Sequence, residues 1–122
     1  MGKNIDTLCV QSGYEPENGA PRVLPLYQST TYYYETPAEM AHLFDVPKDG
    51  HIYSRISNPT VAAFEEKMSA LEGGVGAMAT SSGMAATTMT VMTVCTAGDN
   101  LLSLSTVYGG TFNLLSHTLA KY

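Results

Sequence analysis

The sequence has few charged residues, and basic residues are especially few. Asp, Glu, Lys and Arg make up 14% of the 122 residues, and six Lys and Arg against eleven Asp and Glu give a formal net charge of −5. Nucleic acids and anionic membrane surfaces bind basic protein surfaces, so the charge argues against both as partners. A phosphate ligand would have to be held by a few placed groups rather than by a general positive field. Such a low charge content is typical of a chain that hides much of its surface against further chain or another subunit.

Cysteine is scarce too, and long apolar runs are lacking. Cys9 and Cys95 lie far apart, and neither they nor the three histidines show the spacing of metal ligands. We therefore predict free thiols in a reducing compartment and no metal site. The N-terminal stretch is too polar for a signal peptide, and threonines interrupt the weakly polar run 83–95. These absences favour a soluble cytoplasmic protein.

The first half of the chain is predicted to form an arm followed by two helices. Residues 1–35 are rich in turn formers and then in Tyr and Thr. Pro25 argues against a central strand there, so we expect this part to lie on another surface. A short helix is predicted over 37–44, with Thr36 as its N-cap. A longer helix opens after Asn58, carries an apolar stripe and ends at a Gly-Gly pair.

The second half alternates between strand and helix patterns. Strands are predicted over 75–80 and 101–104, and helices over 84–95 and 111–122. This order indicates an α/β fold with a parallel sheet. Two strands do not make a stable sheet of this kind, and the last helical pattern reaches Tyr122 without a cap, so we expect further chain.

The turn between the first predicted strand and its helix suits an anion. Ser82, Gly83 and Met84 stand where backbone N–H groups are free and the helix dipole is positive. Glycine lets an anion approach the backbone, and serine adds a hydroxyl donor. The alternative is an ordinary strand–helix turn capped by serine, which is the better interpretation when these residues are taken alone.

A tyrosine and an arginine two residues apart form a second candidate site. In an extended segment, Tyr53 and Arg55 place a phenol and a guanidinium on the same side. A hydrogen bond between guanidinium and phosphate is charge-assisted and contributes about 1.5–3 kcal/mol. The alternative is a surface arginine near a helix cap.

A third candidate is Tyr108, which with Gly109 and Gly110 joins the second predicted strand to a helix. An aromatic ring at this junction can lie flat over a planar cofactor, and such stacking contributes about 0.5–1.5 kcal/mol beyond burial. The alternative is a core tyrosine followed by a flexible turn.

Four strings occur in one order along the chain. They are Tyr-Ser-Arg-Ile-Ser-Asn-Pro-Thr (53–60), Leu-Glu-Gly-Gly (71–74), Ser-Gly-Met-Ala (82–85) and Val-Tyr-Gly-Gly-Thr (107–111). In this order the chain resembles the Cys/Met-metabolism family of pyridoxal-phosphate (PLP) enzymes. The resemblance implies the α/β fold of a fold-type I, aspartate aminotransferase-like enzyme with a mainly parallel sheet. Residues 1–58 would then form an N-terminal arm and intersubunit segment, and 59–122 the first part of the PLP-binding domain.

The resemblance also implies a set of cofactor contacts. The residues implied to contact PLP are Tyr53, Arg55, Ser82, Gly83, Met84 and Tyr108. The three at the helix start hold the phosphate, and the tyrosine–arginine pair reaches the phosphate of the neighbouring subunit's cofactor. Tyr108 stacks on the pyridine ring close to the substrate, which makes it the candidate catalytic residue. Family members are dimers of tight dimers, so a homo-oligomer is expected.

In the family, the lysine that binds PLP covalently lies further along the chain, as do the aspartate that pairs with the pyridine nitrogen and the arginine that holds the substrate carboxylate. None of the lysines in this sequence stands in the expected Ser-x-Thr-Lys context. PLP chemistry needs such a lysine and a partner for the pyridine nitrogen. This segment alone should therefore not turn over substrate.

Within the family, Gly110 bears on the reaction, because methionine γ-lyases usually carry cysteine at this position. The run 98–119 is most similar to O-acetylhomoserine sulfhydrylases. The implied transferase reaction belongs to methionine biosynthesis and replaces the acylated γ-hydroxyl of an amino acid by sulfide or a thiol, giving homocysteine with sulfide. The alternatives are methionine γ-lyase, which performs γ-elimination, cystathionine γ-synthase and, in another class, a non-enzymatic phosphate-binding module.

Overall fold

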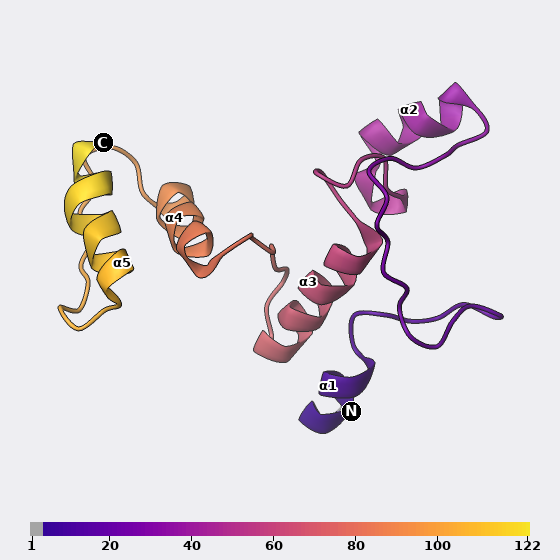
Figure 1. Cartoon of the computed structure of the whole chain (residues 1–122), viewed down its shortest axis with the longest axis horizontal. Helices are drawn as coiled ribbons and strands as arrows, with labels where there is room; N and C mark the ends of the chain where they lie inside the picture. Colours follow the sequence, from indigo (N-terminus) through magenta and orange to yellow (C-terminus); the bar gives the residue numbers. More distant parts are fainter. Residues whose placement is uncertain (1–3) are drawn as a thin grey trace. The chain divides into compact units, whose positions relative to one another are not determined.

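A computed structural model describes residues 4–122, which form helices joined by extended segments (Figure 1). The chain divides into two units, the first ending at Met78 and the second running from Ala79 to Tyr122. No helix within residues 4–122 is long and apolar enough to cross a membrane.

The first unit contains three α-helices and a short 3-10 turn. Their bounds are α1 Ile5–Gln11, α2 Pro37–Asp45, η1 Pro47–Asp49 and α3 Pro59–Glu72. The prediction of α2 is confirmed, because Thr36 Oγ1 accepts a hydrogen bond from the Glu39 N–H at 3.3 Å and the Glu39 carboxylate accepts from the Thr36 N–H at 3.4 Å. This reciprocal pair is a capping box, which satisfies N–H groups that a helix start otherwise leaves open.

Helix α3 also begins and ends where the sequence predicts. Asn58 Oδ1 accepts from the Thr60 N–H at 2.9 Å, and Gly73 ends the helix with φ of 66°. The predicted apolar stripe is present, but its members Val61 and Phe64 are half exposed in this unit. Instead, α3 packs against α1 through the side that carries Ala63 and Lys67 (Figure 1).

Helix α1 was not predicted, since residues 1–35 have no strong helical pattern. Asn4 stands at its N-cap but makes no side-chain cap bond, and the helix is only seven residues long. Its packing on α3 explains why it forms, because a short helix gains its stability from tertiary contacts. Lys67 Nζ donates to the Cys9 carbonyl at 3.2 Å, and Gly13 turns the chain back with φ of 86°.

Gly13 gives a direct test of this packing. A Cβ at Gly13 would overlap the Ala63 carbonyl oxygen and lie 2.9 Å from Lys67 Cβ, whereas Gly19, with φ of 83°, has open space around it. Both alanine variants carry the strain of positive φ, so Gly13→Ala should cost about 1–3 kcal/mol more than Gly19→Ala through overpacking alone. Limited proteolysis of the first 20 residues measures the difference. Equal cleavage rates in the two variants would contradict packing of α1 on α3.

The second unit contains α4 and a distorted C-terminal helix. The bounds are α4 Gly83–Val94, α5 Gly109–Asn113, the π-helical turn η2 Leu114–Thr118 and the 3-10 turn η3 Leu119–Lys121. The predicted helix over 84–95 is confirmed by α4. The predicted helix over 111–122 is present as a continuous helical segment, but its hydrogen bonding changes from α- to π-helical at Leu114 and to 3-10 at Leu119. Here the Ser116 hydroxyl donates to the Phe112 carbonyl at 2.6 Å.

The threonines of α4 bond to their own helix. The hydroxyls of Thr87, Thr88, Thr90 and Thr93 each donate to the carbonyl four residues earlier, at 2.7–2.9 Å. Each hydroxyl hydrogen is therefore satisfied within the helix, and burial of these side chains requires no other acceptor. A threonine-rich helix of this kind is compatible with an apolar environment.

The two predicted strands are present only as extended segments. Residues 75–80 and 101–104 have no strand partner within residues 4–122, where the one isolated bridge joins Thr31 to Tyr53. Leu102 is fully exposed, although its pattern predicts a buried strand. A strand requires a neighbouring strand to satisfy its N–H and C=O groups. The two segments are extended as predicted but form no sheet within residues 4–122, in line with the expectation that two strands alone do not make a stable parallel sheet.

Candidate functional site

The start of α4 presents backbone N–H groups and a serine hydroxyl. Ser82 Oγ accepts from the Ala85 N–H at 3.1 Å, so the capping interpretation of this serine is confirmed. The Ser82 hydroxyl hydrogen is not used by that bond. Among residues 4–122, the N–H groups of Gly83 and Met84 have no hydrogen-bond acceptor. Three donors thus remain at the positive end of a 12-residue helix.

Space for a ligand exists beside these donors. A Cβ placed on Gly83 would meet no atom within 4 Å. Free N–H groups, a helix dipole and open space are together what an anion requires at a helix start. The start of α4 is therefore open to an anion, and the contact of Ser82, Gly83 and Met84 with a phosphate stays a prediction.

Tyr108 lies at the start of α5, which packs beside α4 (Figure 1). The Thr111 hydroxyl donates to Met84 Sδ at 4.0 Å and so joins the starts of the two helices. The Tyr108 ring is 76% exposed, so the alternative of a core tyrosine is wrong for this unit. Two of the predicted segments, 82–84 and 108–111, therefore come together.

Gly110 is pressed against the Tyr108 ring. A Cβ at Gly110 would lie 2.7 Å from Tyr108 Cε1 and 3.2 Å from Met84 Sδ. No real Cβ approaches a ring carbon so closely, so any larger residue at 110 must displace the ring. The contact belongs to Gly110, because a Cβ at Gly109 would meet nothing within 4 Å.

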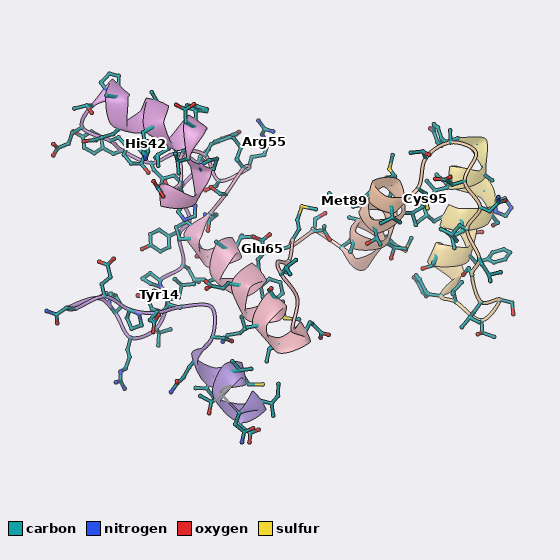
Figure 2. All side chains as sticks on the ribbon, turned by 180° about the vertical axis from the view of Figure 1, so that it is seen from behind. Tyr14, His42, Arg55, Glu65, Met89 and Cys95 are labelled. Carbon is teal, nitrogen blue, oxygen red and sulfur yellow. The ribbon has the colours of Figure 1, made fainter. Side chains whose placement is uncertain are left out.

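Tyr53 and Arg55 lie in the first unit, in the loop between η1 and α3. The predicted extended segment is a turn instead, because the N–H groups of Ile56 and Ser57 both donate to the Tyr53 carbonyl, at 2.8 and 3.0 Å. The turn still brings the two side chains together, with Arg55 Cζ 5.2 Å from the Tyr53 ring centroid. Arg55 is exposed, forms no ion pair with any residue of the described range 4–122, and projects from the loop in Figure 2.

Asn58 is a site residue that sequence reasoning identified only as a helix cap. It is 7% exposed, and its side-chain amide donates to three oxygens of the arm and the loop. The only signal in the sequence was its place in the 53–60 string. Acceptors in residues 27–32 are too distant along the chain for any local pattern to indicate them.

His51 lies next to the same loop. Its Nδ1 is 3.0 Å from Ser57 Oγ, and its ring centroid is 5.9 Å from that of Tyr32. Partial burial lowers the pKa of His51 below its ordinary value, so the ring is neutral at neutral pH. Within residues 4–122 no three His, Cys, Asp or Glu side chains gather as metal ligands would.

A wide hollow of about 750 Å³ also opens in the second unit, away from the predicted site. Its apolar walls include Cys95, Leu101, Leu104, Phe112 and Leu119. None of the six predicted contact residues lines it, so it adds nothing to the candidate site.

Comparison with known proteins shows which family the chain matches. Residues 6–122 match the family model described as Cys/Met metabolism PLP-dependent enzyme. The chain is 45% identical over 118 residues to O-acetyl-L-homoserine sulfhydrylase 1 of Thermus thermophilus, and 40% identical over 117 residues to L-methionine gamma-lyase of Pseudomonas putida. These alignments cover 96% and 95% of this chain but only 28% and 29% of the relatives.

A solved structure has the same fold over this length. A crystal structure described as an O-acetylhomoserine (thiol)-lyase from Campylobacter jejuni superposes with a TM-score of 0.87 at 34% identity. The match covers 99% of this chain and 30% of that chain. The Campylobacter protein carries a pyridoxyl-lysine phosphate.

Proposed function

Since the chain belongs to the Cys/Met-metabolism family of PLP-dependent enzymes, we propose that the whole protein replaces the γ-acetoxy group of O-acetylhomoserine by sulfide, giving homocysteine and acetate. The chain spans less than a third of the length of its relatives, so this reaction is assigned to the complete enzyme. One observation carries the choice of reaction within the family: Gly110 leaves no side chain between Tyr108 and Met84.

The residues of this chain fit the phosphate of PLP. The N–H groups of Gly83 and Met84 and the Ser82 hydroxyl are the three free donors, and the space beside Gly83 is open. A phosphate dianion at this point gains hydrogen bonds and the favourable end of the helix dipole. PLP, when bound, supplies the electron sink that withdraws charge from the substrate's α-carbon.

Tyr108 is proposed as the catalytic residue of this segment. Its exposed ring stands beside the phosphate donors, since α4 and α5 start next to each other. A ring in this place can cover the cofactor, and its hydroxyl can move a proton at the reacting end of the substrate. Such a proton transfer can assist the departure of the leaving group from the γ-carbon.

Tyr53 and Arg55 are proposed to bind the phosphate of a neighbouring subunit's cofactor. Their turn points an unpaired guanidinium outward, as a contact across an interface requires. The proposed enzyme is then a homo-oligomer, a dimer of dimers, in which residues 1–58 form the arm and intersubunit segment. Residues 59–122 begin the PLP-binding domain, and the extended segments 75–80 and 101–104 join its mainly parallel sheet when the rest of the chain is present.

A second candidate function is methionine γ-elimination, which the similarity to the Pseudomonas lyase favours. The contact between Gly110 and Tyr108 favours replacement over elimination. A cysteine at 110, as lyases usually carry, would need the space that the Tyr108 ring occupies. A cysteine at position 110 would therefore be incompatible with the position of the Tyr108 ring in this chain.

Steady-state kinetics of the full-length enzyme tests the proposal. We expect a higher kcat/KM for O-acetylhomoserine with sulfide than for methionine breakdown, and we expect Gly110→Cys to move the ratio toward methionine because it displaces the ring. Gly109→Ala is the matched control, since its Cβ would meet no atom within 4 Å. A higher kcat/KM for methionine in the wild type would leave the family assignment in place and assign the elimination reaction instead.

A further inference from the structure

We infer that Asn58 is a positioning residue, which holds the Tyr53–Arg55 turn against the arm and thereby sets the direction in which Arg55 is presented. Docking of the arm and retention of the cofactor phosphate are then coupled through one buried amide. The inference rests on the proposed phosphate contact of Arg55 and adds a second residue that acts through it.

Asn58 is a buried polar side chain of the first unit, and both the nitrogen and the oxygen of its side-chain amide form hydrogen bonds. Its Nδ2 donates to the Tyr27 carbonyl at 2.9 Å, to Ser54 Oγ at 3.0 Å and to Tyr32 Oη at 3.1 Å. Its Oδ1 caps α3 at the Thr60 N–H. Two amide hydrogens thus serve three acceptors, so one of them is shared. Buried groups in such a network hold a single geometry, because any rotation leaves one of them unsatisfied.

Ser54 transmits this constraint, because it stands between the two proposed phosphate ligands. Its hydroxyl donates to the Ser29 carbonyl, and its N–H donates to the Thr30 carbonyl at 2.9 Å. With its hydrogen committed, Ser54 Oγ accepts from Asn58 and from the Tyr32 hydroxyl, which lies 3.1 Å away. The middle residue of the turn is therefore fixed on both its backbone and its side chain.

The arm is fixed a second time on the other side of Asn58. Thr60 Oγ1 donates to the Pro25 carbonyl at 3.1 Å and accepts from the Tyr27 N–H at 3.0 Å. The arm segment 25–32 is thus bonded to residues on both sides of Asn58, and Asn58 itself bonds to Tyr27 and Tyr32. A shift of the arm by one residue would break all of these bonds together.

Arg55 has no such fixation of its own. Its guanidinium is exposed, forms no ion pair within residues 4–122, and lies 5.2 Å from the centroid of the Tyr53 ring. An arginine without an anchoring ion pair samples many rotamers, which costs binding energy when it must be ordered. The direction of the Arg55 side chain therefore depends on the backbone of the turn, which the side-chain amide of Asn58 holds in place.

A double-mutant cycle on the full-length enzyme tests the coupling. Asn58→Ser keeps a good N-cap for α3 and removes the amide donor, so the helix remains capped. We expect PLP to bind the Asn58→Ser apoenzyme about tenfold more weakly, the equivalent of about 1.4 kcal/mol. In an Arg55→Ala background the same change should cost little further affinity, because the residue through which it acts is gone. Ser54→Ala should behave in the same way.

Tyr34→Phe is the control, since it removes a bond of 2.9 Å from the arm to the His51 carbonyl without touching Ser54. PLP affinity should be unchanged in this variant. An equal loss from Asn58→Ser with and without Arg55 would overturn the inference, because it would show general destabilisation, and it would leave the phosphate role of Arg55 in place. Unchanged PLP affinity in Arg55→Ala alone would overturn that role and the inference together.

Discussion

Replacement of Tyr108 by phenylalanine is expected to lower kcat by about 10²–10⁴-fold while PLP stays bound, because the substitution keeps the ring and removes the transferable proton. The ring packs against Gly110 through its carbon atoms Cε1 and Cδ1, so its position does not depend on the hydroxyl. Stopped-flow and steady-state assays of the full-length enzyme measure the loss, and the absorbance of bound PLP reports retention of the cofactor.

The control for this variant is Tyr33→Phe, in which an exposed phenol of the first unit loses its hydroxyl. This variant should keep wild-type kcat. A Tyr108→Phe enzyme with full kcat would show that the ring only covers the cofactor and that another group transfers the proton. Loss of PLP from Tyr108→Phe would instead assign the hydroxyl to cofactor binding.

Subunits that carry Arg55→Ala are expected to regain activity when they are mixed with Tyr108→Phe subunits. The Arg55→Ala enzyme alone should bind PLP about 10- to 100-fold more weakly, because the phosphate loses a charge-assisted partner contributing about 1.5–3 kcal/mol. If Arg55 serves the neighbour's cofactor, a mixed pair of subunits contains one site with both Tyr108 and Arg55 intact. Activity of the purified mixed oligomer at limiting PLP measures this recovery.

The alternative predicts no recovery at all. If Arg55 serves the cofactor of its own subunit, then each site of the mixed pair carries one of the two defects. Verified mixed oligomers as inactive as the two parents would therefore place Arg55 and Tyr108 of one chain in the same site. Mixing each variant with itself under the same conditions controls for effects of subunit exchange.

Much of the local structure was predictable, because helix starts depend on neighbouring residues. Thr36, Asn58 and Ser82 each cap the helix that the sequence assigns to them. Gly73 ends α3 in the left-handed region, as expected of a glycine after a helix. These signals involve residues two to four positions apart, so the sequence contains them in full.

Features that depend on distant contacts were not predictable. Helix α1 forms because Gly13 brings it against α3, some fifty residues further along the chain. Extended segments have a β pattern but form a sheet only when a neighbouring strand is present, which accounts for the absence of a sheet at 75–80 and 101–104 within residues 4–122. The π-helical turn at Leu114 follows α5 without a proline or glycine that would have indicated a change in the helix at this point.

The same distinction between local and distant contacts applies to the candidate site. The residue types at 53–55, 82–84 and 108–111 indicated an anion and a planar ring, and the structure supplies the free donors and the exposed tyrosine. The turn at Tyr53 and the buried amide of Asn58 were not indicated, because both depend on the arm crossing back over the loop.

The fit of Gly110 against Tyr108 and Met84 has a consequence for how this enzyme can change over evolutionary time. A side chain cannot enter position 110 until the Tyr108 ring has moved, since a Cβ there would lie 2.7 Å from the ring and 3.2 Å from the Met84 thioether. Shortening Met84 relieves only the longer of these two contacts. A lineage that acquires a cysteine at 110 therefore passes through an ancestor whose Tyr108 ring is displaced, unless a substitution that relocates the ring comes first.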